Sequence, residues 1–76
     1  MEFEIVPDWY GYKLITGIGF GGGEIYEIHI IRKRGKLTVV VPPMHEYTHT
    51  HYMLPEVAEV MAEAIKQAAE FCRQNN

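Results

Sequence analysis

Two runs of β-branched residues joined by a two-residue link restrict the fold of this chain more than any other feature. Residues 24–33 and 36–41 are rich in isoleucine and valine, and Arg34 and Gly35 stand between them. A two-residue loop in which glycine supplies a positive φ is typical of a tight β-hairpin. The directly opposed pairs are then Arg32 with Leu37, Ile30 with Val39, and Ile28 with Val41. All the apolar partners therefore share one face of the sheet.

Two further strands are predicted before this hairpin. Residues 2–6 alternate apolar and polar side chains and stop at Pro7 and Asp8, which indicates a short strand and a turn. Residues 12–20 carry mostly apolar side chains at even positions and run into three consecutive glycines. A turn at these glycines predicts four opposed pairs: Phe20 with Glu24, Ile18 with Tyr26, Thr16 with Ile28, and Leu14 with Ile30. The apolar face then continues across three strands.

The last third of the chain predicts an amphipathic helix over residues 55–73. Pro55 suits the first helical position, and apolar residues recur at helical spacing. Alanines and Val60 widen the apolar stripe to roughly 200°, about twice what contact with one sheet requires. Between the hairpin and the helix, residues 45–52 read as a further strand or a long connection. The whole chain, residues 1–76, is predicted to be one α+β domain, an antiparallel three- to four-stranded β-meander packed on one C-terminal α-helix (ββββα).

Composition narrows the class of protein. With 76 residues there is room for one core, and 47% hydrophobic with 22% charged residues is ordinary for a globular domain. The single cysteine, Cys72, forms no disulfide within the chain, and no signal peptide or membrane-spanning run is visible, so we expect a cytoplasmic protein. A domain this small is marginally stable alone, which favours a homodimer.

The leading functional expectation is a non-enzymatic module that binds another protein. The chain has no serine, and Cys72 falls on the apolar helix stripe, so we expect neither catalysis nor a cofactor. Aromatic residues are favoured at the centres of interfaces. The candidate partner-binding residues are Trp9, Tyr10, Tyr47, Tyr52 and Val60. In size and style the chain resembles the small inhibitors and adaptors that mobile elements encode.

Two alternatives stay open. A basic hairpin tip suggests contact with single-stranded nucleic acid through Arg32, Lys33, Arg34 and Lys36, although a net charge of −3 argues against the chain as a whole. In outline the order of elements is similar to that of the single-strand-binding transcriptional coactivators of the PC-four type, without matching motif residues. The second alternative is a metal site, because the histidines His45, His49 and His51 would share one face of an extended segment.

Overall fold

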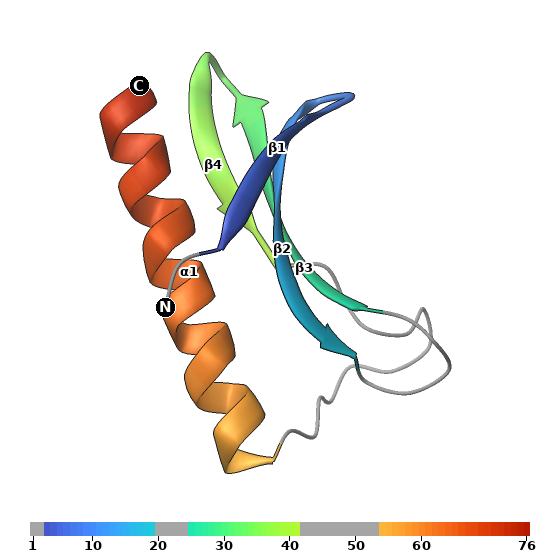
Figure 1. The fold of residues 1–76 in the computed structure, drawn as a ribbon. Coiled ribbons are helices and arrows are strands. Elements are labelled where there is room, and N and C mark those ends of the chain that lie inside the picture. Colours follow the sequence, from blue (N-terminus) through green and yellow to red (C-terminus); the bar gives the residue numbers. More distant parts are fainter. Residues whose placement is uncertain (1–2, 20–24, 42–53) are drawn as a thin grey trace.

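In the described part of the chain, the fold is one antiparallel sheet with one helix against it. The computed structural model describes residues 3–19, 25–41 and 54–76. Four strands lie side by side in chain order, β1 (Glu4–Asp8), β2 (Gly11–Gly19), β3 (Ile25–Lys33) and β4 (Lys36–Val40). Helix α1 (Pro55–Asn75) runs along the sheet (Figure 1). The predicted ββββα meander is confirmed, while residues 45–52 lie outside the described residues.

The hairpin between β3 and β4 has the predicted loop. Arg34 and Gly35 have φ angles of 54° and 80°, so both central residues are left-handed, as a type I′ turn requires. The predicted pairs Arg32 with Leu37 and Ile30 with Val39 are confirmed. The ladder ends at His29 and Val40, one pair short of the third predicted pair.

The predicted end of the first strand is wrong. Strand β1 continues through Pro7 to Asp8, and the turn to β2 consists of Trp9 and Tyr10. A proline is tolerated there because β1 is an edge strand. Since hydrogen-bonded and non-bonded pairs alternate along an antiparallel ladder closed at Asp8 and Gly11, the nitrogen of Pro7 points away from β2.

The predicted register between β2 and β3 is wrong by two residues over the first half of β2. Leu14 lies opposite Ile28 instead of Ile30, whereas Gly19 lies opposite Ile25, as the prediction required. Because the shift is an even number of residues, Leu14 stays on the core face.

A bulge between Ile15 and Gly19 causes this shift. Residues 16–18 of β2 stand against Tyr26 alone, and Gly17 takes a φ of 75°. The Thr16 hydroxyl donates a hydrogen bond to the Tyr26 carbonyl oxygen at 2.7 Å and accepts one from the Ile18 amide at 3.2 Å. The threonine side chain thus links the Tyr26 carbonyl oxygen of β3 to the backbone of the bulge in β2.

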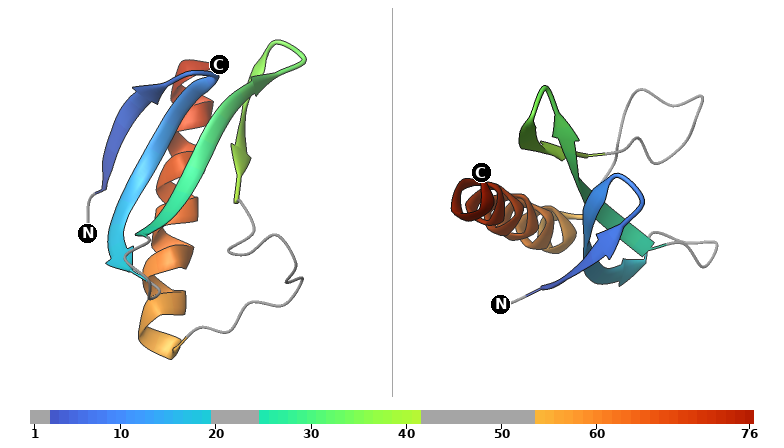
Figure 2. Two further views of the ribbon diagram at one scale, coloured as in Figure 1. Left: turned by 90° about the vertical axis from the view of Figure 1, so that its right-hand side faces the viewer. Right: turned by 90° about the horizontal axis from the view of Figure 1, so that it is seen from above.

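Helix α1 covers one face of the sheet (Figure 2). The helix begins after Leu54, which makes no side-chain cap hydrogen bond, and Pro55 occupies the first turn as predicted. Tyr12 and Phe71 add an edge-to-face ring contact with centroids 4.8 Å apart. The buried apolar side chains are Leu14, Tyr26, Ile28, Ile30 and Leu37 from the sheet and Met61, Ala64, Ala68 and Cys72 from the helix.

The buried part of the helix is narrower than its apolar stripe. Ile65 is 38% exposed, and Ala58 and Ala62, two of the alanines that widen the stripe, are exposed. Two buried helix positions are alanines, whose small side chains allow α1 to lie close to the sheet.

Amide side chains from the helical segment bind both edges of the sheet. At the β1 edge, Gln67 Oε1 accepts a hydrogen bond from the Phe3 amide at 3.2 Å. At the β4 edge, Asn76 Oδ1 accepts from the Leu37 amide at 2.6 Å, and Asn76 Nδ2 donates to the Leu37 carbonyl oxygen at 3.2 Å. The carboxamide of Asn76 therefore pairs with Leu37 as a neighbouring strand would.

Candidate functional site

Both tight turns lie at one end of the sheet, beside the C-terminal end of α1 (Figures 1 and 2). Trp9 is 92% exposed and Tyr10 79% exposed, the two highest values among the large apolar side chains of the described residues. The cationic side chains of the β3–β4 hairpin are exposed as well. We call this surface the turn end, and it consists of Trp9, Tyr10, Arg32, Lys33, Arg34 and Lys36.

The backbone fixes the position of the aromatic turn. Asp8 Oδ1 accepts a hydrogen bond from the Trp9 amide at 2.8 Å, and the Arg32 amide donates to the Tyr10 carbonyl oxygen at 3.3 Å. Gly11 follows with a φ of 154°, and a Cβ at this position would collide with the carbonyl oxygen of Ile30. The glycine therefore permits a close approach between β2 and β3 directly beneath Trp9 and Tyr10.

An open groove of about 410 Å³ joins the aromatic turn to the basic hairpin. Residues 7–12 line it together with Arg32 and Leu37. Arg32 Nη1 donates to the Gly35 carbonyl oxygen at 3.2 Å, which holds the guanidinium beside the second turn. The structure thus brings together Trp9 and Tyr10, predicted for protein contact, and the basic residues predicted for nucleic acid.

Charge is unevenly distributed over the molecule. The turn end carries four of the seven lysine and arginine residues of a chain whose net charge is −3. Asp8, the acidic residue of the groove, holds the Trp9 amide. An anionic group that approaches the turn end therefore meets a local field opposite to that of the chain as a whole.

The other predicted site residues do not join this surface. Val60 is half-buried in the second turn of α1, at the helix end away from the turn end (Figure 1). The remaining candidates lie outside the described residues: Tyr47, Tyr52, His45, His49 and His51. Within the described ranges, no three histidine, cysteine, aspartate or glutamate side chains gather closely enough to hold a metal ion.

The sheet face opposite α1 mixes half-buried apolar and charged residues. His29 Nε2 lies 3.2 Å from Glu27 Oε2, and both side chains are about one-third exposed. We call this surface the outer face, and its half-buried apolar members are Val6, Ile15, Ile31 and Val40.

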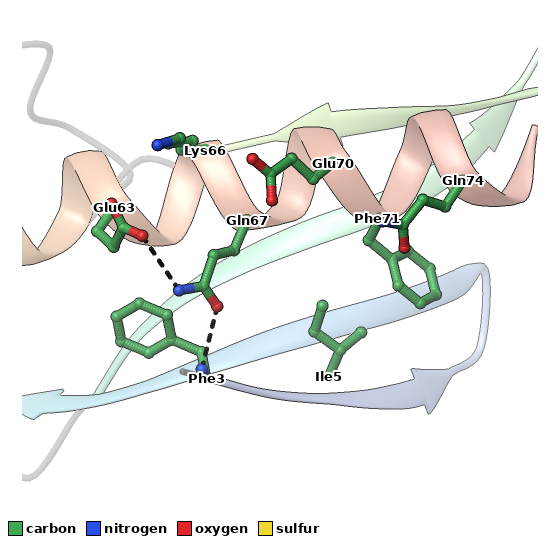
Figure 3. Close-up of a pocket in the computed structure, with 8 residues that line it drawn as sticks. All are labelled: Phe3, Ile5, Glu63, Lys66, Gln67, Glu70, Phe71 and Gln74. Atoms are coloured by element: carbon green, nitrogen blue, oxygen red, sulfur yellow. Dashed lines mark hydrogen bonds between the residues drawn. The ribbon is translucent and has the colours of Figure 1, made fainter. Parts of the chain in front are cut away.

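Sequence reasoning missed a second groove, of about 420 Å³, between β1 and α1. In Figure 3, Gln67 reaches from the helix to the Phe3 amide and donates to Glu63 Oε1 at 3.3 Å. Ile5 and Phe71 lie farther along the same groove. No sequence signal could locate it, because the groove depends on the placement of an edge strand relative to a helix distant in sequence.

Comparison of the chain with known protein families, characterised proteins and solved structures finds no match. In the part of the chain that the structure describes, no helix combines the length and the apolar character needed to cross a membrane.

Proposed function

We propose that the protein is a small non-enzymatic binding module that acts by protein–protein contact, with the turn end as its contact surface. The observation that carries this proposal is the nearly complete exposure of Trp9 and Tyr10 beside Arg32. Tryptophan, tyrosine and arginine are the residue types that most often dominate the binding energy of interfaces.

The free energy available from burying Trp9 favours the same surface. Burying a tryptophan removes about 150–250 Å² from water, worth about 4–6 kcal/mol at 25 cal/mol/Å² before the costs of association. Folding buries almost none of the Trp9 surface, so nearly all of the free energy of burying it is available for binding a partner. The hydrogen bonds at Asp8 and Tyr10 order the turn in advance, which lowers the entropic cost of binding.

The proposal assigns no reaction to the chain. The sequence contains no serine, and Cys72 lies in the core, 6% exposed, where burial raises the pKa of its thiol. A thiol that holds its proton more tightly is a poorer nucleophile at neutral pH. An inhibitor or adaptor of the mobile-element type, acting in the reducing cytoplasm, is the role that fits a module of this size.

Affinity capture from a lysate of the source organism tests the proposal. The immobilised baits are the native chain, the double variant Trp9→Ala, Tyr10→Ala, and a control, Leu54→Ala, whose side chain is 69% exposed before α1. We expect proteins that the native chain and the control retain and the double variant loses. Equal retention by all three baits would refute the turn end as the contact surface. Circular dichroism should show all three folded, because exposed substitutions change stability by about 0.5 kcal/mol or less.

Self-association through the outer face is part of the same proposal. Its half-buried apolar residues alternate with Lys13, Glu27 and His29, and such mixed charges allow a second copy to pair with the first. Sedimentation analysis should report a dimer that Ile15→Glu dissociates. A monomer at about 1 mM would remove this part of the proposal and leave the turn end unaffected.

The groove that joins aromatic and basic residues favours one second candidate function, contact with single-stranded nucleic acid. Bases stack on aromatic rings while lysine and arginine neutralise phosphates. Fluorescence anisotropy with a 15-nucleotide oligothymidylate at about 50 mM salt tests it. Binding that weakens on replacing Lys33 and Lys36 by alanine would support this candidate, and the absence of binding would end it.

A further inference from the structure

We infer that the partner segment received by the turn end is acidic, a stretch of protein in which an apolar side chain for Trp9 is accompanied by aspartate or glutamate. This inference rests on the proposed function and adds the chemistry of the partner. Three features of the β3–β4 hairpin carry it.

The first feature is a directly opposed pair of like charges. Lys33 and Lys36 face each other across the ladder next to the turn, and both are exposed. Like charges at directly opposed positions destabilise a sheet. A carboxylate placed between the two ammonium groups would relieve that repulsion, so the pair is more favourable with an anionic partner than without one.

The second feature is the residue type at the first turn position. Arg34 takes a φ of 54°, a conformation that costs a side-chain-bearing residue free energy and that type I′ turns usually assign to asparagine, aspartate or glycine. The Arg34 side chain is exposed, and folding therefore gives no reason for a long cation there. An unfavourable backbone conformation at an exposed cation points to a role in contact.

The third feature is the guanidinium of Arg32. The hydrogen bond from Nη1 to the Gly35 carbonyl oxygen holds it between the groove and the hairpin turn. Arginine offers five N–H donors in a planar fork that matches a carboxylate. A carboxylate in the groove would lie close to the aromatic turn, which places an acidic and an apolar contact within one short segment.

Charge also separates this partner from nucleic acid and from a second copy. Asp8 lines the same groove as Trp9, so a base stacked on Trp9 would bring its phosphates near a carboxylate. Two turn ends facing each other would oppose two clusters of four cations. An acidic segment of another protein can avoid both repulsions, because it can place an uncharged residue beside Asp8 and its carboxylates at Arg32 and the hairpin lysines, whereas a nucleic acid carries a phosphate at every nucleotide.

Selection from a phage library of random 12-residue peptides tests the inference. The baits are the native chain and the charge-reversed variant Arg34→Glu, Lys36→Glu. We expect the native chain to enrich acidic peptides with one large apolar residue, and the reversed variant to enrich neutral or basic ones. One selected peptide is then synthesised and titrated by calorimetry. Its Kd should rise about tenfold or more with Trp9→Ala, and it should remain unchanged with Leu54→Ala.

Arg34→Asn supplies a readout that a merely structural role would not produce. Asparagine suits the left-handed turn position better than arginine does. The variant should therefore melt at a higher temperature than the native chain and bind the acidic peptide more weakly. A variant that is more stable and binds equally well would overturn the role of Arg34 and, with it, the second feature.

The outcomes separate the inference from the proposed function. Selection of neutral or basic peptides whose binding depends on Trp9 would refute the inference of an acidic partner. Protein contact at the turn end would still be supported. Selected peptides that bind the Trp9→Ala, Tyr10→Ala variant equally well would overturn both. Tighter binding of the oligothymidylate than of any selected peptide would overturn the inference in favour of nucleic acid, and salt-sensitive self-association of the chain would replace the foreign partner with a second copy.

Discussion

Replacing Gly11 by alanine should destabilise the protein more than the same change at Gly17 or Gly35. Gly11 has a φ of 154°, and the added Cβ would collide with the carbonyl oxygen of Ile30, a backbone atom of the neighbouring strand. Strand β3 cannot easily move away from β2, because Ile31 is paired with Gly11 and the Arg32 amide donates a hydrogen bond to the Tyr10 carbonyl oxygen.

The magnitude follows from three contributions. Backbone strain at a conformation reserved for glycine costs about 1–3 kcal/mol. Separation of the strands enough to relieve the collision sacrifices about one hydrogen bond at the turn, about 1 kcal/mol. Alanine also lowers the conformational entropy of the unfolded chain, which offsets the loss of stability by about 0.4–1 kcal/mol. The expected net loss is about 2–3 kcal/mol, a large part of the roughly 4–11 kcal/mol available to a domain of this size.

Urea unfolding followed by circular dichroism measures this loss. With a slope of about 1 kcal/mol per molar urea, the midpoint should fall by about 2–3 M. Gly17→Ala and Gly35→Ala are matched controls, because both glycines have positive φ, yet within the described residues no heavy atom beyond the adjacent residues lies within 4 Å of the added methyl. They should lose about 1 kcal/mol each. If Gly11→Ala unfolds at the same urea concentration as these controls, the close approach beneath the turn end is refuted.

Three further substitutions test the core, the thiol and the β4 edge. Leu14→Ala should cost about 2–5 kcal/mol, since the side chain is fully buried, and a native melting temperature would contradict the placement of the core. Burial raises the pKa of Cys72, so the folded state holds that proton more tightly; stability should therefore fall as pH rises above about 8.5, and Cys72→Ala should remove this part of the slope. Asn76→Ala should cost about 1–2 kcal/mol and accelerate hydrogen exchange at the Leu37 amide. Asn75→Ala, whose side-chain amide donates to the Phe71 carbonyl oxygen within α1, should leave the Leu37 amide protected.

Local signals made the hairpin and the helix predictable. The type I′ turn is formed by Arg34 and Gly35, two adjacent residues that stand between two runs of β-branched residues. Pro55 and the helical spacing of apolar residues likewise act within a few residues of each other. The hairpin and the helix could therefore be predicted without knowing which residues pack against them.

The errors occurred where distant residues decide the outcome. Pro7 would end a central strand, and only its position at the sheet edge allows β1 to continue to Asp8. The bulge at Gly17 depends on the hydroxyl of Thr16 reaching the Tyr26 carbonyl oxygen across the sheet. A glycine inside a strand pattern is a known signal of a bulge, although it does not specify how many residues are added.

The candidate site was predicted in parts. Trp9, Tyr10 and the four cations were all named from the sequence, but for different functions. Turns one and three of a meander lie at the same end of the sheet, so the predicted meander already places the two groups at one end. The shared groove also depends on the close approach of β2 and β3 at Gly11, which involves residues distant in sequence.

Gln67 and Asn76 form hydrogen bonds to the two edges of the sheet, so separation of α1 from the sheet breaks contacts at both edges. A movement that lifts α1 would expose the apolar core and simultaneously free the backbone groups at Phe3 and Leu37. Such an open form would expose backbone hydrogen-bonding groups at both edges of the sheet, which favours either rapid closure or exchange of α1 between two chains. Partial opening of α1 therefore exposes more than the apolar core, and the closed arrangement of helix and sheet is favoured at both edges.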